Sequence, residues 1–492
     1  MTLEDHLRKA TRNFTLALPE DQVLALARDL ARELQRAHAE TPPRHPPLEP
    51  AAIAMEDGKP RLGAPATALG SNREDLFQLG ALVNALALGR PADVSWRLDG
   101  PPPLEVKSLA RRAALAALGS PLQGARLESA DAAVRALEAA LAPSSDAASP
   151  WPLFRGDAGR SGAVARPELR GLRPLWSAAL GPVVASPVVQ GPFVIAATAD
   201  GRVVFLDRDT GRSVHELKLA SAIESSPALH EARLYVGTDD GDCACVDAGD
   251  GRALWKAKLG DVVRSSPLVH DGKLLVGVIE GKGGSLVALD AAKGKLVWKR
   301  KLGGPVFSSP ALHRSLALVG SDDGSLHAID VQKGEPAWSH ALGAKVRATP
   351  AVAGERVLAA DFAGRVCALA AADGTRAWLR ETGAAIYSSP CAASGAVLVG
   401  NNDGLLIGSE LETGAARFEL ATRGPVVASA LALGERFLIG STDGALYLLD
   451  AKGALVERTP LANGGIQSTP ALASGALYVG TADGVRALEL LS

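Results

Sequence analysis

The sequence predicts a small helical domain followed by an all-β, eight-bladed propeller. Three observations support this fold class. Apolar residues have helical spacing before residue 142, a unit of about 40 residues repeats after Trp151, and Asp-Gly pairs typical of hairpin turns recur within the repeat. The 492 residues are 47% hydrophobic and 22% charged, which is the composition of globular domains and excludes general disorder.

The first part of the chain shows the periodicity of amphipathic helices. In 21–38, apolar residues recur every three or four positions, and 74–88, 104–118 and 129–141 are similar. A Pro- and Ser-containing segment, 142–150, then predicts a linker. The predicted divisions are a helical domain at 1–141, a linker and lead-in at 142–162, and the propeller at 163–492.

A Ser/Thr-Pro pair marks the units of the repeat. Its proline lies at 187, 227, 267, 310, 350, 390 and 470, and Ala430 replaces it in the remaining copy. The first seven copies each hold four strand-length runs, and the eight copies together predict eight four-stranded blades. The last copy has only three strands, whereas an additional strand-like segment, 174–180, precedes the first copy. We expect this segment to complete the eighth blade and close the ring without an open edge.

A tryptophan recurs in the fourth strand of the repeat. It occurs as Trp176, Trp255, Trp298, Trp338 and Trp378, and His215, Phe418 and Glu457 take the same position elsewhere. With the accompanying Ala-x-Asp and Gly residues, as at 288–290 and Gly294, the repeat resembles the tryptophan-docking repeat of PQQ-binding-like (quinoprotein) propellers. The segment 151–162 resembles the lead-in of such proteins. The resemblance implies that these tryptophans pack against the neighbouring blade.

The helical part resembles the C-terminal lobe of bacterial Ser/Thr protein kinases. The matching segments are 45–53, 75–80, 88–91 and Arg126. The resemblance implies a catalytic Asp, a Lys and a metal-binding Asn where this chain has Pro47, Glu49 and Ala52, and 63–65 reads Gly-Ala-Pro instead of Asp-Phe-Gly. Phosphoryl transfer needs a base and Mg²⁺ ligands. We therefore expect an inactive pseudokinase lobe without the N-terminal lobe.

The resemblance to quinoproteins also implies one enzyme class, the PQQ-dependent dehydrogenases. That class usually has a vicinal Cys-Cys pair, a Ca²⁺ site and an export signal, which the sequence does not show. Its four cysteines are Cys243, Cys245, Cys367 and Cys391. Cys243 and Cys245 share one face of a strand without further ligands at zinc spacing, so we interpret them as small buried hydrophobes. We expect no catalytic residues, no metal site and no cofactor.

Charge and termini indicate the class of partner. The 52 basic and 54 acidic residues leave no basic surface for phosphates, so nucleic acid is not an expected partner. The first residues are acidic where a signal peptide is basic, and no apolar run is long enough to span a membrane. We expect a cytoplasmic protein, and the high Ala, Leu and Arg content favours a bacterial source.

One repeat position varies although its neighbours are nearly constant. It lies three residues before the repeat proline and holds, in order, Val184, Glu224, Arg264, Phe307, Arg347, Tyr387, Val427 and Gln467. Equivalent positions should form one ring at the mouth of the central channel. Arg and Tyr are typical of binding surfaces, so we predict a partner or ligand ring of Glu224, Arg264, Phe307, Arg347, Tyr387 and Gln467. The alternative is ordinary variation at the surface.

Together these observations favour a non-catalytic scaffold that binds protein through the channel-mouth face. The main alternative is a sensor, in which the propeller binds a small ligand and the pseudokinase lobe relays to a signalling partner. An outer-membrane assembly lipoprotein of similar propeller type is disfavoured because the sequence shows neither a signal peptide nor a lipidation cysteine. A PQQ-dependent dehydrogenase is the least favoured interpretation.

Overall fold

The computed structural model describes residues 151–165, 169–191, 193–248, 251–473 and 475–491, together with Asp29, Arg32 and two strands near the N-terminus. The chain forms two compact units, Met1–Ala147 and Ala148–Ser492. Among the described residues, no helix is long and apolar enough to cross a membrane.

The described part of the first unit contains one hairpin. Strands β1 (Ile53–Glu56) and β2 (Lys59–Leu62) pair antiparallel, with Glu56 opposite Lys59. Asp29 and Arg32 are helical and belong to the predicted helix at 21–38. The all-α prediction did not include this hairpin, because two four-residue strands are too short to show a clear alternation, although Asp57-Gly58 between them is a typical turn pair. The class of the whole domain stays a prediction, since most of its residues lie outside the described ones. The kinase-like motifs and the linker at 142–150 lie outside the described residues.

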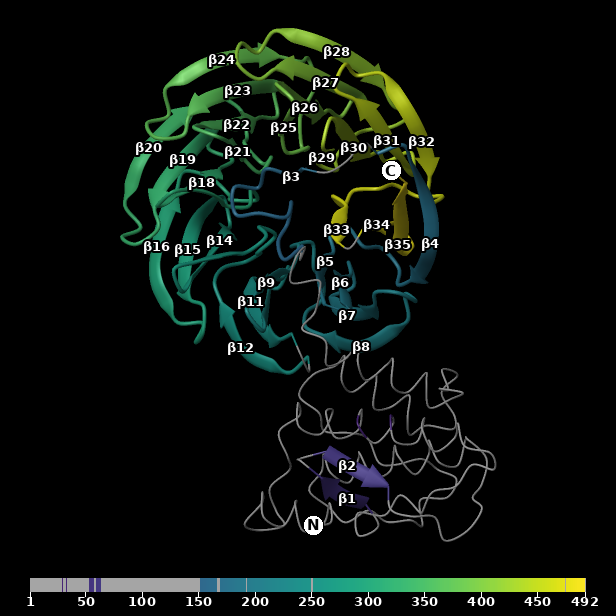
Figure 1. Ribbon diagram of the computed structural model, residues 1–492. Coiled ribbons are helices and arrows are strands. Elements are labelled where there is room, and N and C mark those ends of the chain that lie inside the picture. Colours follow the sequence, from purple (N-terminus) through teal and green to yellow (C-terminus); the bar gives the residue numbers. More distant parts are fainter. Residues whose placement is uncertain are drawn as a thin grey trace. The chain divides into compact units, whose positions relative to one another are not determined.

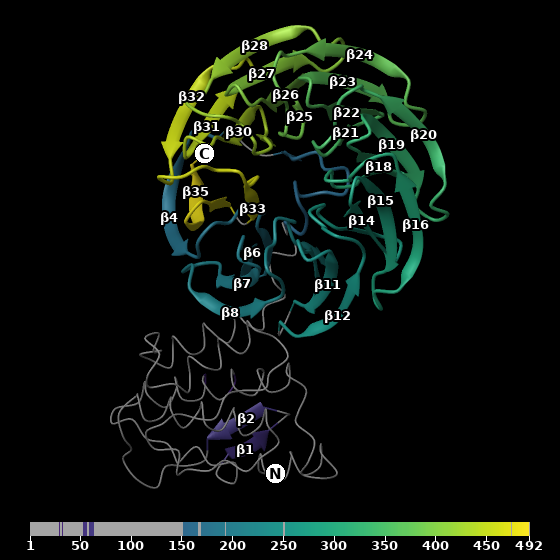
Figure 2. The ribbon, with the colours of Figure 1, turned by 180° about the vertical axis from the view of Figure 1, so that it is seen from behind.

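The second unit is an eight-bladed propeller, as predicted, and both views show the blades arranged around a central axis (Figure 1, Figure 2). The innermost strands are β5 (Val188–Gln190), β9 (Ala228–His230), β13 (Leu268–His270), β17 (Ala311–His313), β21 (Ala351–Ala353), β25 (Cys391–Ala393), β29 (Leu431–Leu433) and β33 (Ala471–Ala473). The second strands are β6 (Phe193–Ala197), β10 (Arg233–Gly237), β14 (Lys273–Glu280), β18 (Leu316–Gly320), β22 (Arg356–Ala360), β26 (Ala396–Gly400), β30 (Arg436–Gly440) and β34 (Ala476–Thr481).

The outer half of each blade consists of two further antiparallel strands. The third strands are β7 (Arg202–Asp207), β11 (Asp242–Asp247), β15 (Gly283–Asp290), β19 (Ser325–Asp330), β23 (Arg365–Ala370), β27 (Leu405–Glu410), β31 (Ala445–Asp450) and β35 (Gly484–Leu491). The outermost strands are β8 (Ser213–Lys218), β12 (Ala253–Lys258), β16 (Leu296–Leu302), β20 (Pro336–Ala341), β24 (Arg376–Glu381), β28 (Ala416–Ala421), β32 (Leu455–Pro460) and β4 (Gly171–Ala179).

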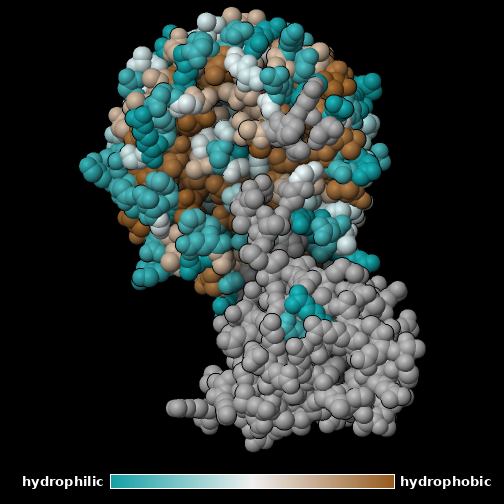
Figure 3. Space-filling view, in the orientation of Figure 1, coloured by the Kyte–Doolittle hydropathy of each residue, from teal (hydrophilic) through white to brown (hydrophobic). Residues whose placement is uncertain are grey.

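Differences in burial explain why the inner and outermost strands have different patterns of apolar residues. The second and third strands are continuous apolar runs because neighbouring blades cover both of their faces; in β10, Leu234, Tyr235 and Val236 are fully buried. The outermost strands are partly exposed, and hydrophilic residues gather along the outer circumference (Figure 3). Tight turns join the strands. Gly241, with φ of +76°, is required at its turn because a Cβ there would lie 2.0 Å from the carbonyl oxygen of Gly260.

The eighth blade closes the ring as the sequence predicts. Strand β4 pairs antiparallel with β35, and Trp176 lies opposite Ala487. The closing strand begins at Gly171 instead of residue 174, because Gly171, Leu172 and Arg173 continue the pairing with the end of β35. Strand β4, which precedes the first blade in the chain, and the last strand, β35, thereby lie side by side in one sheet.

Each predicted docking tryptophan bridges its blade to the next one. The indole N–H groups donate to backbone carbonyls: Trp176 to Arg208 (2.7 Å), Trp255 to Ala291 (3.2 Å), Trp298 to Val331 (2.9 Å), Trp338 to Ala371 (3.2 Å) and Trp378 to Leu411 (2.8 Å). At the equivalent position, the Glu457 carboxylate accepts the Leu172 N–H at 3.2 Å.

Residues 151–164, which we call the lead-in segment, lie inside the ring instead of forming part of a linker. The segment contacts the innermost strands in chain order, and includes the short strand β3 (Ala163–Val164), which pairs parallel with β29 (Figure 1). Its carbonyl groups accept N–H groups at five blades: Trp151 from Val189 (3.0 Å), Pro152 from Leu229 (2.7 Å), Ala158 from Leu312 (2.8 Å), Gly159 from Val352 (2.9 Å) and Gly162 from Ala432 (2.8 Å). The propeller therefore starts at Trp151, and not at residue 163 as the sequence analysis predicts.

Candidate functional site

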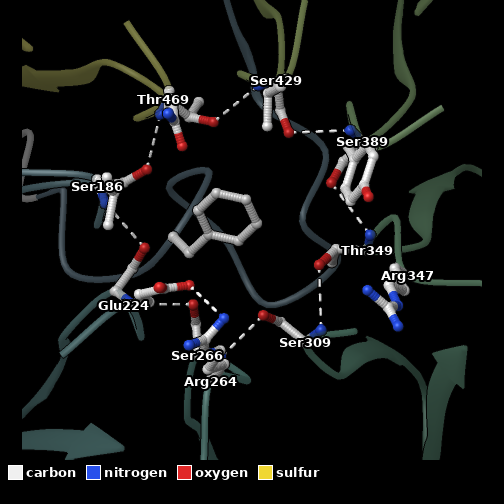
Figure 4. Close-up of a pocket in the computed structure, with 16 residues that line it drawn as sticks. Ser186, Glu224, Arg264, Ser266, Ser309, Arg347, Thr349, Ser389, Ser429 and Thr469 are labelled. Atoms are coloured by element: carbon white, nitrogen blue, oxygen red, sulfur yellow. Dashed lines mark hydrogen bonds and ion pairs between the residues drawn. The ribbon is translucent and has the colours of Figure 1, made fainter. Parts of the chain in front are cut away.

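The Ser/Thr residue before each repeat proline carries the most regular contact of the molecule. Its backbone N–H donates to the hydroxyl oxygen of the equivalent residue in the next blade. The donor–acceptor pairs are Ser186–Ser226 (2.9 Å), Ser226–Ser266 (3.2 Å), Ser266–Ser309 (2.8 Å), Ser309–Thr349 (3.1 Å), Thr349–Ser389 (3.1 Å), Ser389–Ser429 (2.9 Å), Ser429–Thr469 (3.1 Å) and Thr469–Ser186 (2.8 Å). We call these eight residues the hydroxyl ring (Figure 4).

The hydroxyl ring explains the one irregular copy of the repeat. Where Ala430 replaces the proline, Ser429 still supplies a hydroxyl group, and its oxygen accepts the N–H of Ser389. Every member of the ring is at most 5% exposed. A buried N–H must find an acceptor, so the hydroxyl oxygen and not the proline is the constant requirement at this point of the blade.

The hydroxyl ring lines a cavity of about 170 Å³ on the propeller axis. Seven of the eight residues at the variable position line the same cavity: Val184, Glu224, Arg264, Arg347, Tyr387, Val427 and Gln467. The exception is Phe307, which lies against Arg347, with the guanidinium carbon 3.9 Å from the centre of its ring. Phe154 of the lead-in segment adds an aromatic wall that sequence reasoning missed, because nothing in the sequence places the lead-in on the axis.

Both arginines of the predicted ring are bound to acids. Arg347 donates from two nitrogens to Asp322 (2.9 and 2.7 Å), and Arg264 pairs with Asp239 (2.7 Å) as well as with Glu224 (2.9 Å). Sequence reasoning missed Asp239 and Asp322. A signal was present, because each Asp precedes its Arg by 25 residues and follows the second strand of the preceding blade. The two guanidinium groups are consequently fixed in position and largely neutralised.

Aromatic rings surround one of these arginines. Phe362 precedes Tyr387 by the same 25 residues, and their ring centres are 4.3 Å apart. The Arg347 guanidinium lies 5.0 Å from Phe362 and 3.9 Å from Phe307, within the range of cation–π attraction. We call Phe307, Arg347, Phe362 and Tyr387 the aromatic–arginine cluster. Tyr387 remains 38% exposed, so the cluster is rigid yet accessible.

The acid in the predicted ring has a shifted pKa. Burial raises the pKa of Glu224 above its ordinary value, Arg264 opposes this shift, and Asp239 adds to it. Glu224 therefore takes up a proton more readily than an exposed glutamate, and its protonation removes one of the two carboxylates that pair with Arg264.

Buried side chains anchor the lead-in segment. The fully buried Arg160 donates to the carbonyls of Pro267 (2.8 Å) and Pro310 (3.1 Å), and burial lowers its pKa to about 9. The fully buried Arg155 lies in the same segment and donates to the carbonyl of Ser161 at 3.0 Å.

The four cysteines are buried and form no disulfide, in agreement with their interpretation as hydrophobes. Burial raises the pKa of each thiol, to about 12 for Cys245 and Cys367. In the part of the chain that the structure describes, no three His, Cys, Asp or Glu side chains are grouped as a metal site.

Eight four-stranded blades, docking tryptophans and an N-terminal closing strand define a propeller of the PQQ-like repeat class. A family model described as the beta-propeller of beta-alanine-activating enzyme matches residues 181–485. The chain therefore belongs to this propeller family. A search of curated proteins found no match.

Solved structures share the fold. BamB from Moraxella catarrhalis matches with a TM-score of 0.58 and 21% identity, over 65% of this chain and 100% of BamB. Quinohemoprotein alcohol dehydrogenase ADHIIG from Pseudomonas putida HK5 matches with a TM-score of 0.62 and 16% identity, over 70% of this chain and 80% of the enzyme. The computationally designed protein Ika8 matches with a TM-score of 0.58 and 15% identity, over 65% and 100%. At these identities the similarity shows a common fold, which by itself assigns no function.

Proposed function

We propose that this chain is a non-catalytic scaffold of the bacterial cytoplasm that binds a protein partner at the channel-mouth face of its propeller. The observation that carries the proposal is the aromatic–arginine cluster. Protein interfaces depend on a few Tyr, Trp and Arg side chains in well-packed surroundings. Here Arg347 and Tyr387 are accessible and belong to one packed group.

The cluster is organised before any partner arrives. Asp322 is only 7% exposed and holds Arg347 through two hydrogen bonds, while Phe362 holds the ring of Tyr387. Side chains that are already ordered lose little conformational entropy on binding. The neighbouring pair of Arg264 and Glu224 supplies a polar rim, which is the usual arrangement around the centre of an interface.

Capture of partners by the full chain from its native cytosol tests the scaffold. The variants Arg347→Ala and Tyr387→Ala should each lose a stoichiometric partner that the unaltered protein retains. Arg417→Ala is the matched control, because it also removes an arginine paired with an acid, Glu410 at 3.1 Å, but on the outermost strand β28. If all three variants retain the same partner, the channel-mouth cluster is not its binding site.

The sensor is the second candidate, and the axial cavity of about 170 Å³ favours it. Its relay, the predicted pseudokinase lobe, lies outside the described residues. A thermal-shift screen of small metabolites on the full chain distinguishes the two: stabilisation by one compound, together with no captured protein, supports the sensor.

A further inference from the structure

We propose that the partner inserts a C-terminal carboxylate into the axial cavity, where the hydroxyl ring binds it. This inference rests on the proposed scaffold function and names the chemistry that its channel-mouth site recognises.

The hydrogen bonds of the hydroxyl ring all run in one direction. Each hydroxyl oxygen accepts one backbone N–H from the preceding blade. Among the described residues, none accepts a hydrogen bond from these eight O–H groups, although each residue is at least 95% buried. A buried donor without an acceptor is unfavourable. The cavity therefore presents a circle of free donors and suits a group rich in acceptor oxygens.

The charged side chains at the cavity pair with one another, which leaves the hydroxyl donors to decide what binds. Two guanidinium groups, Arg264 and Arg347, line the cavity, and Glu224 is the only carboxylate among its described lining residues. Arg264 pairs with Glu224 (2.9 Å) and Asp239 (2.7 Å), and Arg347 pairs with Asp322 (2.7 Å). The guanidinium groups are therefore already matched by acids, and the preference for a carboxylate comes from the hydroxyl donors. An ionised carboxylate is acceptor-only and takes about four hydrogen bonds, whereas a carboxamide brings N–H donors that this ring of donors cannot satisfy. The donors of the hydroxyl ring therefore favour a carboxylate, which only accepts hydrogen bonds, over a neutral amide.

The size of the cavity suits the end of a chain. A cavity of about 170 Å³ exceeds the roughly 10–15 Å³ that one water requires, and it is smaller than the about 300–1,000 Å³ of drug-sized sites. A helix or strand cannot enter, but a chain end can. A terminal residue brings its carboxylate without a continuing chain, whereas an internal Asp or Glu must pass two flanking segments across the rim. Phe154 and Tyr387 offer aromatic surface to the last side chains.

The experiment uses the full-length protein and a library of random heptapeptides in two forms, one with a free C-terminal carboxylate and one amidated. We expect selection to enrich free-carboxylate peptides, and amidation of a selected peptide should weaken binding about tenfold or more, as for the loss of hydrogen bonds to a charged group. Equal binding of both forms, binding through an internal Asp or Glu, or enrichment of no peptide overturns the inference. Competition by acetate alone, without peptide binding, assigns the ring to a free small carboxylate and also overturns it.

A pair of variants keeps the test independent of folding. Thr349→Val removes one hydroxyl of the ring at nearly constant shape, and Thr349→Ser retains it. The Val variant should lose several-fold in affinity for a free-carboxylate peptide and the Ser variant should not, with urea unfolding confirming that both are folded. The scaffold can also be separated from its chemistry. If a captured partner depends on Tyr387 but still binds after carboxypeptidase removes its C-terminal residues, the scaffold stands and the carboxylate inference fails.

Discussion

The propeller joins neighbouring blades at two radii, and the two joints differ in what they tolerate. The outer joint is a tryptophan in five blades, but His215, Phe418 and Glu457 take its place in the others. The inner joint is a hydroxyl group in all eight blades. Apart from the buried Trp378, the outer side chains are partly exposed and can exchange one packing contact for another, whereas the inner hydroxyl must accept a buried N–H that has no other partner. Regularity is therefore strict only where an unsatisfied group has no access to water.

The largest loss of stability is expected at the outer joint, because its tryptophan is a large side chain to remove. Trp378 is 7% exposed and packs over Gly414 of the next blade. Trp378→Ala should lower the free energy of unfolding by about 3–5 kcal/mol, measured by urea titration with circular dichroism. Trp378→Phe is the control, since Phe418 occurs naturally at this position; it should cost only about 1 kcal/mol for the lost bond to the Leu411 carbonyl. Equal losses in both variants would show that packing does not dominate this joint.

An intermediate loss of stability is expected at the inner joint, from a substitution that hardly changes the size of the side chain. Ser309→Ala leaves the N–H of Ser266 buried without an acceptor and should cost about 1–3 kcal/mol in the same titration. Ser309→Thr should remain close to the unaltered protein, because Thr349 and Thr469 already serve in the ring. If Ser309→Ala is as stable as Ser309→Thr, the strictness of the inner joint does not come from hydrogen bonding.

The smallest effect is the pH dependence of stability that Glu224 contributes at the channel mouth, beside the inner joint. Because the pKa of Glu224 is raised in the folded protein, its protonated form favours folding, and that contribution is lost as the pH rises through the raised pKa. Glu224→Gln should match the unaltered protein below the ordinary pKa of glutamate and become slightly more stable above it. The side chain is 42% exposed, so the difference should stay below about 1 kcal/mol. A stability difference that is constant from acid to neutral pH contradicts this assignment.

The axial cavity also combines a constant part with a variable part. The hydroxyl ring is constant, whereas the variable ring beside it holds Glu224, Arg264, Tyr387 and other side chains of different chemistry. The constant hydroxyl ring suits recognition of one common group, such as a carboxylate. The variable residues beside it suit selection among the different ligands that carry this group. Partner capture and peptide selection test these two levels separately.

The sequence by itself determined the number of blades, the four strands of each and the closing strand, because these follow from local alternation, turn residues and a repeat period that any reader can count. The same periodicity placed the variable residues at equivalent points. The predicted pseudokinase lobe remains a prediction, since its motifs lie outside the described residues.

Only the tertiary structure decided which of these equivalent residues touch. Ser186 and Thr469 are 283 residues apart and meet because the ring curves back on itself. The pairing of Asp322 with Arg347, and the passage of Phe154 and Arg160 along the axis, likewise depend on the position of one blade relative to the next. Local sequence patterns encode the blades, but the way the blades are arranged in a ring depends on the contacts between all eight of them. The cavity at their centre therefore exists only in the complete ring.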